Sequence, residues 1–164
     1  MEPPLGLIAL QTYLNHVFGD AIEGKLIKSR IDFDSYEDLD NLVKDFKPDL
    51  IGVSAMTFHK DFFHQAIKSL RENGYDKTIV VGGPHPTTSY NEVLNDRNID
   101  VCAIGEGELI LADLVKALMD NQNDKLSDEE LNKINGIAFV TKDENHKIFQ
   151  KQDQNKSNNT SLNF

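Results

Sequence analysis

The sequence has a single cysteine, Cys102, among its 164 residues. One thiol cannot build a disulfide framework, a four-cysteine zinc site or a cysteine-held iron–sulfur cluster. We therefore expect no iron–sulfur cluster in this chain. Cys102 lies inside a short apolar run, so it is predicted to be a small, buried and inert hydrophobic residue.

Long apolar runs and positive charge are also scarce. No stretch approaches the roughly 18 apolar residues of a membrane-spanning helix, and no basic start precedes an apolar run as in a signal peptide. Lys and Arg number 17 against 27 Asp and Glu, which gives a net charge of −10. Such a field repels the phosphates of nucleic acids and anionic lipids. These features predict a cytoplasmic, acidic globular domain with no nucleic-acid or membrane partner.

Short apolar runs alternate with segments of helical spacing. Hydrophobic positions three and four residues apart predict helices over 5–18, 36–46, 58–73 and 108–119. Strands are predicted over 25–33 (half-buried, near a sheet edge), 49–54 (covered on both faces), 78–81 and 100–104, with a hairpin over 136–149. This alternation indicates an α/β fold of the Rossmann-like (flavodoxin-like) class, with a doubly wound, mainly parallel sheet and helices on both faces.

The chain divides into three predicted parts. Residues 1–122 form the Rossmann-like domain, and residues 123–150 add a helical turn and a β-hairpin. Residues 151–164 contain almost no apolar side chains. Such a segment cannot offset the entropy lost on ordering, so it is predicted to be a polar tail or linker.

Three predicted strands end in loops with unusual residues: Ser54–Thr57, Gly82–Thr87 and Gly105–Glu108. In an open parallel sheet, ligands bind beyond the carboxyl ends of the strands. Glycines there permit positive φ and let a flat ligand approach the backbone. Gly and Ser turns commonly end parallel strands without any ligand, but three such loops on one sheet edge favour a ligand site.

The order of the motifs carries a family resemblance. The segments PPLGLIALQTYL, PDLIGVSAMT, VVGGPHPTT, DVCAIGEGE and INGIAFV, spread over about residues 3–140, resemble the cobalamin-binding domain of cobalamin-dependent radical SAM enzymes. The resemblance implies a domain that holds cobalamin with its nucleotide tail buried beside the sheet and its corrin ring on the carboxyl-end loops. It also implies a radical SAM catalytic domain as a partner.

The resemblance further assigns roles to residues. Ser54 and Thr57 would hydrogen-bond near the buried tail, and Gly82 and Gly83 would make space for its benzimidazole plane. The remaining residues of the three loops would contact the corrin ring. The complete implied cofactor-binding set is Ser54, Met56, Thr57, Phe58, Gly82, Gly83, Pro84, His85, Pro86, Thr87, Gly105, Glu106, Gly107 and Glu108. No catalytic or metal-ligating residue is assigned.

The chain departs from the family pattern in several ways. No apolar strand precedes the PPLGL segment, which would leave a gap in the sheet between 27–33 and 50–54 and expose strand edges that favour a homodimer. There is no Asp-x-His-x-x-Gly loop to supply a histidine to cobalt, and no Cys-x-x-x-Cys-x-x-Cys motif. The chain alone is therefore expected not to be catalytic. It is interpreted as the cobalamin-binding module of, or derived from, a radical SAM methyltransferase-like enzyme.

Other interpretations stay open at this point. His85, between two prolines, could be a structural loop histidine, and Glu106 and Glu108 could simply stabilise a helix start. His59 and His64 are five residues apart, which disfavours a shared zinc ion. The fold could also serve as a cofactor-free interaction or regulatory module. A flavodoxin-like nucleotide binder is a further alternative, although neither glycine-rich phosphate-binding motif is present.

Overall fold

The computed structural model describes residues 4–56, 60–121, 125–142 and 146–151. The predicted tail 152–164 and the hairpin turn at 143–145 lie outside these residues. The elements in chain order are α1 (Leu5–Phe18), the 3-10 turn η1 (Gly19–Ala21), α2 (Tyr36–Phe46), β1 (Leu50–Ser54), α3 (Lys60–Glu72), β2 (Thr78–Gly82), α4 (Pro84–Val93), β3 (Val101–Ala103), α5 (Gly107–Asn121), α6 (Asp128–Leu131), β4 (Ile137–Val140) and β5 (Ile148–Lys151).

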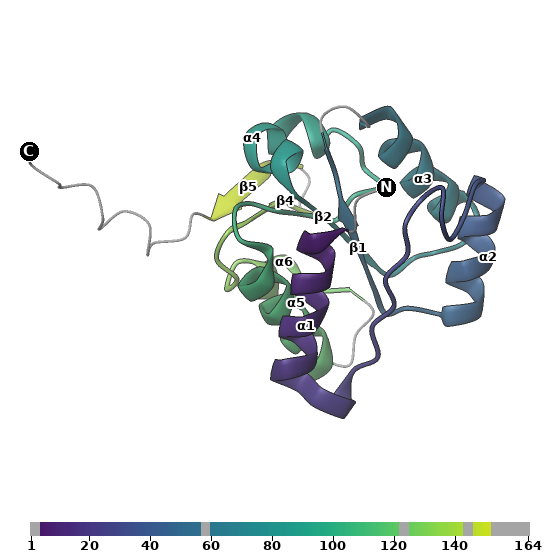
Figure 1. Cartoon of the computed structure of the whole chain (residues 1–164). Coiled ribbons are helices and arrows are strands. Elements are labelled where there is room, and N and C mark those ends of the chain that lie inside the picture. Colours follow the sequence, from purple (N-terminus) through teal and green to yellow (C-terminus); the bar gives the residue numbers. More distant parts are fainter. Residues whose placement is uncertain (1–3, 57–59, 122–124, 143–145, 152–164) are drawn as a thin grey trace, which may run out of the picture.

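The five strands form one sheet in the order β1-β2-β3-β4-β5. The first three strands are parallel, and the hairpin of β4 and β5 adds two antiparallel strands next to β3. Helices lie on both faces, with α1 and α5 on one side and α2 and α3 on the other (Figure 1). The predicted α/β, Rossmann-like class is confirmed, with a mixed sheet.

The central strands are apolar on both faces because both are covered. Ile79, Val81 and Cys102 face the helices α3 and α4, where Phe63 and Ile67 complete the core. The alternate residues of the same strands face α5 and α6 in a second cluster, which contains Val80, Val101, Ala103, Ile110, Leu114 and Leu131. Two buried faces explain why these strands read as continuous apolar runs rather than as alternating patterns.

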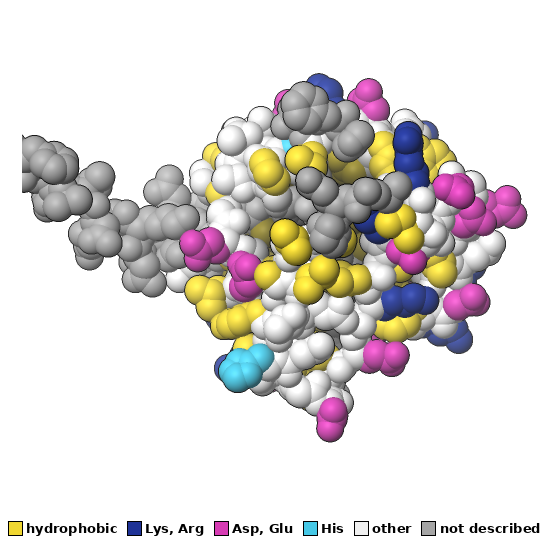
Figure 2. All heavy atoms as spheres, viewed as in Figure 1, with side chains coloured by type: hydrophobic (Ala, Val, Ile, Leu, Met, Phe, Trp, Pro, Cys, Tyr) yellow, Lys and Arg dark blue, Asp and Glu magenta, His cyan; other side chains and the backbone are white. Residues whose placement is uncertain are grey.

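Helix α1 is the least embedded element. It packs along α5, and an added Cβ at Gly107 would lie 3.2 Å from Leu10. No residue of α1 is buried, and Leu5, Ile8 and Val17 are exposed. Figure 2 shows hydrophobic side chains at the surface over this helix. The helix therefore packs on α5 and keeps much of its apolar surface exposed.

The prediction of a strand over 25–33 is wrong. The segment forms a tight turn in which Arg30 has φ 64° and its N–H donates to the carbonyl of Phe33 (2.8 Å). The Asp32 carboxylate accepts from the N–H of Lys28 (2.7 Å), which stabilises the turn. Only an isolated bridge between Ser29 and Phe33 remains. A strand needs a neighbour, and the described residues place none beside this segment.

The prediction that strand 49–54 is covered on both faces is also wrong. In the described chain β1 is an edge strand that pairs only with β2, and its burial is partial. Gly52 and Ser54 are exposed. Strand β1 is therefore more apolar than expected for a strand that its neighbours in the structure cover only in part.

Helices α2 and α6 both begin with a capping box. The Ser35 hydroxyl accepts from the N–H of Asp38 while the Asp38 carboxylate accepts from the N–H of Ser35. Ser127 and Glu130 repeat the arrangement on α6. Hydrogen bonds to the ionised form lower the pKa of both carboxyls, chiefly from the Ser35 side chain for Asp38 and from the Ser127 backbone for Glu130.

Cys102 is fully buried, and desolvation raises the pKa of its thiol to about 12, as predicted for an inert residue. We expect it to react with iodoacetamide at least about 100-fold more slowly in the native protein than in urea, because only the thiolate is nucleophilic. Mass spectrometry of timed samples measures both rates. Equal rates in the native protein and in urea would show that β3 does not protect the Cys102 thiol from the reagent.

No helix among the described residues is both long enough and apolar enough to cross a membrane.

Candidate functional site

The carboxyl ends of β1, β2 and β3 lie together at one edge of the sheet. Ser54, the last residue of β1, is in register with Gly82, the last residue of β2. An added Cβ at Gly82 would lie 3.6 Å from the Cβ of Ala103, the last residue of β3. The three predicted loops therefore leave the sheet side by side.

The first two loops are joined by backbone hydrogen bonds. The N–H of Ala55 donates to the carbonyl of Gly82 (2.8 Å), and the N–H of His85 donates to the carbonyl of Ala55 (3.4 Å). Gly83 lies between these contacts with φ 105° and ψ −172°, a region that is essentially restricted to glycine. A Cβ there would come within 2.9 Å of the Ala55 carbonyl oxygen. The approach of the two loops thus requires a glycine at 83, independently of any ligand.

Thr87 connects the second loop to the third. Its hydroxyl donates to the carbonyl of Gly83 (2.8 Å) and accepts from the N–H of Gly105 (3.2 Å). One side chain thereby fixes the two loops relative to each other. Thr87 was predicted to contact the ligand. In the structure, its hydroxyl holds the backbone of the second and third loops together.

The interpretation of Gly82–Thr87 as a loop needs correction. Helix α4 begins at Pro84, because a proline fits the first turn of a helix without losing a hydrogen bond. His85 is therefore a helical residue. It is only 3% exposed, packs edge-on against Phe63, and its Nε2 has no hydrogen-bond partner among the described residues. A buried, unpaired ring nitrogen is costly unless something else supplies the partner.

One face of the sheet near this edge carries only small residues. Ser54, Gly82 and Ala103 form a row across the three strands, and Gly52 lies one step back on β1. An added Cβ at Gly52 would meet a single atom, Cγ1 of Val80, at 3.9 Å. We call these four residues the small-residue strip. At each of its two glycines an added Cβ would meet a single atom within 4 Å.

Sequence reasoning found two members of the strip, Ser54 and Gly82, and missed Gly52 and Ala103. The spacing could have revealed Gly52, because Gly52 and Ser54 are two residues apart on one strand and therefore share a face. A glycine inside an apolar strand often marks the close approach of a ligand or another backbone.

The remaining predicted residues lie around the rim. Met56 is 53% exposed, and Pro84, Gly105 and Glu106 are also exposed. Gly107 and Glu108 open helix α5 and are half-buried, whereas Pro86 is fully buried within α4. The predicted contacts Thr57 and Phe58 lie outside the described residues, as does His59.

His64, the other histidine considered for a metal site, is engaged elsewhere. Its Nδ1 lies 2.6 Å from the Asp96 carboxylate and links α3 to the segment after α4. No group of three or more potential metal ligands occurs in the described part of the chain.

The chain is 29% identical over 141 residues to an uncharacterized methyltransferase of Pyrococcus horikoshii, covering 84% of this chain and 28% of that protein. It is 31% identical over 119 residues to the anaerobic magnesium-protoporphyrin IX monomethyl ester cyclase of Cereibacter sphaeroides, covering 72% of this chain and 19% of that protein. The chain thus spans less than a third of these curated relatives.

A solved structure shares the fold. The cobalamin-dependent S-adenosylmethionine radical enzyme OxsB, solved with aqua-cobalamin and S-adenosylmethionine bound, superposes with a TM-score of 0.71. The match is 23% identical and covers 92% of this chain and 20% of OxsB.

The sequence profile of the B12 binding domain matches residues 2–115. This match spans most of the chain, including α1, the first three strands and the three loops at their carboxyl ends. The chain belongs to the family of B12-binding domains.

Proposed function

We propose that this chain binds cobalamin at the carboxyl edge of β1, β2 and β3. The nucleotide tail would lie against the small-residue strip below α1, and the corrin ring would lie on the loops around Met56 and Gly105–Glu108. The observation that carries this proposal is the strip itself. On the same face, one step back along β2 and β3, Val80 and Val101 carry branched side chains, whereas no residue of the strip is larger than serine.

The polar groups at this edge fit the chemistry of the cofactor. Cobalamin is a large, flat molecule fringed with amides, so it needs apolar surface and a few hydrogen-bonding groups rather than a charged pocket. The exposed Ser54 hydroxyl has no partner among the described residues, and Nε2 of His85 is buried and unpaired. The Ser54 hydroxyl can exchange a hydrogen bond with a cofactor amide, whereas the His85 ring lies against Phe63 in the core on the other face of the sheet.

We also propose that the chain acts as the corrinoid-holding part of a radical SAM methyltransferase-like enzyme. Cobalamin would supply the cobalt chemistry of methyl transfer, and the radical chemistry would come from a separate catalytic domain. The names of the matched relatives and the small share of each that this chain covers support this division. A cytoplasmic location and a homodimer through strand edges stay predictions.

The test is a spectral titration and gel filtration with hydroxocobalamin. We expect corrin absorbance to elute with the protein, whereas FMN and ATP should neither co-elute nor raise the melting temperature. Cobinamide, which lacks the nucleotide tail, serves as the matched ligand. Because it cannot fill the strip, it should bind more weakly. A colourless protein peak at saturating hydroxocobalamin would contradict the proposal. Equal affinities for cobinamide and hydroxocobalamin would show that the nucleotide tail does not lie on the strip.

A further inference from the structure

Thr87, near the start of α4, is bonded to two of the loops at the carboxyl edge at once. Its hydroxyl donates to the carbonyl of Gly83 at 2.8 Å and accepts from the N–H of Gly105 at 3.2 Å. A hydroxyl has one proton to donate and two lone pairs that accept. The proton is therefore committed to the second loop, and one of the lone pairs is committed to the third.

The bond from Thr87 to Gly83 is a common feature of helices, where threonine hydroxyls often donate to the carbonyl four residues earlier. Thr88, the next residue of α4, does the same, because its hydroxyl lies 3.2 Å from the carbonyl oxygens of Pro84 and His85. The second bond distinguishes Thr87 from Thr88, since Gly105 follows β3 and belongs to another part of the fold.

The third loop is short, and the bond from Thr87 meets it in the middle. Before the loop, the N–H of Ile104 donates to the carbonyl of Gly136 (2.7 Å). After the loop, α5 begins at Gly107. Gly105 lies between these two points, is exposed, and has φ 97°, a left-handed conformation that favours glycine. Thr87 thus restrains the loop at its most conformationally permissive residue.

We propose that Thr87 is a positioning residue for the corrin ring, which it serves by holding the third loop against the second. This inference rests on the proposed function, in which the nucleotide tail lies on the small-residue strip and the corrin ring lies on the loops around Met56 and Gly105–Glu108. A cofactor that contacts several loops binds more tightly when they are already held in the bound arrangement, because less conformational entropy is lost on binding.

Substitutions at position 87 separate the hydroxyl from the rest of the side chain. Valine has nearly the same shape but can make neither hydrogen bond, whereas serine keeps the hydroxyl and loses only a methyl group. We expect Thr87→Val to weaken hydroxocobalamin binding roughly fivefold, the scale of one neutral hydrogen bond, and Thr87→Ser to restore most of the affinity. Thr87→Ala removes both bonds with a smaller side chain and replaces the valine variant if that variant does not fold.

Thr88→Val is the matched control. It removes the same hydroxyl from the neighbouring residue of the same helix, where both contacts of that hydroxyl lie within α4. It should leave the affinity for hydroxocobalamin unchanged.

Cobinamide identifies the part of the cofactor that Thr87 serves. The third loop is assigned to the corrin ring, which cobinamide and hydroxocobalamin share, so Thr87→Val should weaken both ligands by the same factor. Gly82→Val changes the strip assigned to the nucleotide tail, so it should weaken hydroxocobalamin far more than cobinamide.

The cofactor-free protein gives a measurement that does not depend on cobalamin. In ¹H–¹⁵N NMR, we expect the exposed Gly105 amide to exchange its hydrogen more slowly than in an unstructured peptide, because it is bonded to Thr87. Exchange should become about fivefold faster in Thr87→Val, in line with the loss of one hydrogen bond. It should stay slow in Thr87→Ser and in Thr88→Val.

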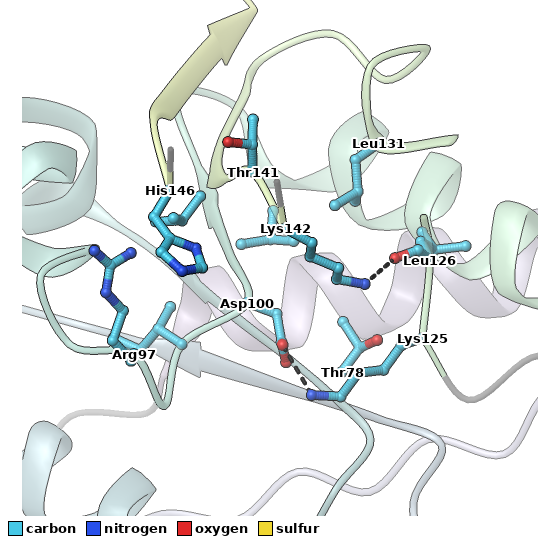
Figure 3. Close-up of a pocket in the computed structure, with 12 residues that line it drawn as sticks. Thr78, Arg97, Asp100, Lys125, Leu126, Leu131, Thr141, Lys142 and His146 are labelled. Carbon is cyan, nitrogen blue, oxygen red and sulfur yellow. Dashed lines mark hydrogen bonds and ion pairs between the residues drawn. The ribbon is translucent and has the colours of Figure 1, made fainter. Parts of the chain in front are cut away.

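A second control lies at the opposite edge of the sheet, in a cleft of about 260 Å³ lined by residues that include the first residues of β2 and β3. Figure 3 shows Lys125 and Asp100 there, with Nζ and Oδ1 3.1 Å apart. None of the described residues that line this cleft belongs to the three loops. Lys125→Gln removes a partly exposed ion pair and should change neither Gly105 exchange nor cofactor affinity.

Three results would overturn the proposal. Unprotected exchange of Gly105 in the wild type would show that the bond to Thr87 is absent in solution. Equal weakening of cofactor binding by Thr87→Val and Thr88→Val would show a general effect on α4. Unchanged affinity in Thr87→Val, with faster Gly105 exchange, would show that the restraint does not serve the cofactor.

Failure of the proposed function would be seen separately. If the wild type takes up no hydroxocobalamin, the role of Thr87 toward the corrin ring is refuted together with that function. The exchange of Gly105 in the cofactor-free variants would still decide whether Thr87 holds the third loop.

Discussion

Replacing Gly82 by valine is expected to weaken cobalamin binding roughly 10- to 100-fold. The added methyl groups would project from the small-residue strip into the space assigned to the nucleotide tail, and overpacking of this kind costs about 1–3 kcal/mol. The protein itself accepts a Cβ at this position, because the nearest atom, Cβ of Ala103, would lie at an ordinary contact distance of 3.6 Å. Titration of hydroxocobalamin into the variant, followed by its visible spectrum, measures the loss.

A variant that is destabilised at a position far from the strip controls for a loss of binding caused by lower stability. Gly74, in the turn after α3 at the other edge of the sheet, has φ 95°, so Gly74→Ala strains the backbone and lowers stability by roughly 1 kcal/mol. It should leave the dissociation constant of cobalamin unchanged. Unaltered affinity in Gly82→Val, with a native circular dichroism spectrum, would show that the tail does not lie on the strip.

Gly83→Ala is expected to lower the free energy of unfolding by about 2–4 kcal/mol. The residue has a backbone conformation that costs other residues about 1–3 kcal/mol, and its new Cβ would come within 2.9 Å of the Ala55 carbonyl oxygen, a rigid backbone atom. Urea unfolding monitored by circular dichroism measures the change without any ligand. The loss is a large fraction of the 5–15 kcal/mol that typically stabilises a domain.

The neighbouring glycine supplies the matched control. Gly82→Ala adds the same methyl group one residue earlier, where φ is not positive and the contact with Ala103 is ordinary, so its effect on unfolding should stay within about 1 kcal/mol. Equal destabilisation by the two variants would mean that the loop after β2 does not hold the conformation described here.

Much of the fold could be predicted from local patterns. The segments predicted as buried strands, 78–81 and 100–104, correspond to β2 and β3. The segment 36–46, predicted as a helix from its hydrophobic spacing, forms α2. The Ser35 capping box also formed as its sequence signature indicates. These elements depend on short-range chemistry, namely side-chain periodicity and the satisfaction of helix-end N–H groups, which a sequence displays directly.

The two wrong strand predictions share one cause. Residues 25–33 have an alternating pattern suitable for a strand, yet the structure forms a turn around Arg30 there. The run in β1 suggested two covered faces, yet β1 is an edge strand with Gly52 exposed. Whether an alternating or apolar segment pairs depends on which strand lies beside it, and that information is not local.

The sequence by itself indicated the three parallel strands, most of the helices and the family of the chain, because periodicity and turn residues act over a few neighbours. Only the tertiary structure decided that Gly52 and Ala103 join Ser54 and Gly82 in one strip, and that His85 is buried with no hydrogen-bond partner for its Nε2 among the described residues. These residues are distant in sequence, and parallel pairing and helix packing bring them together.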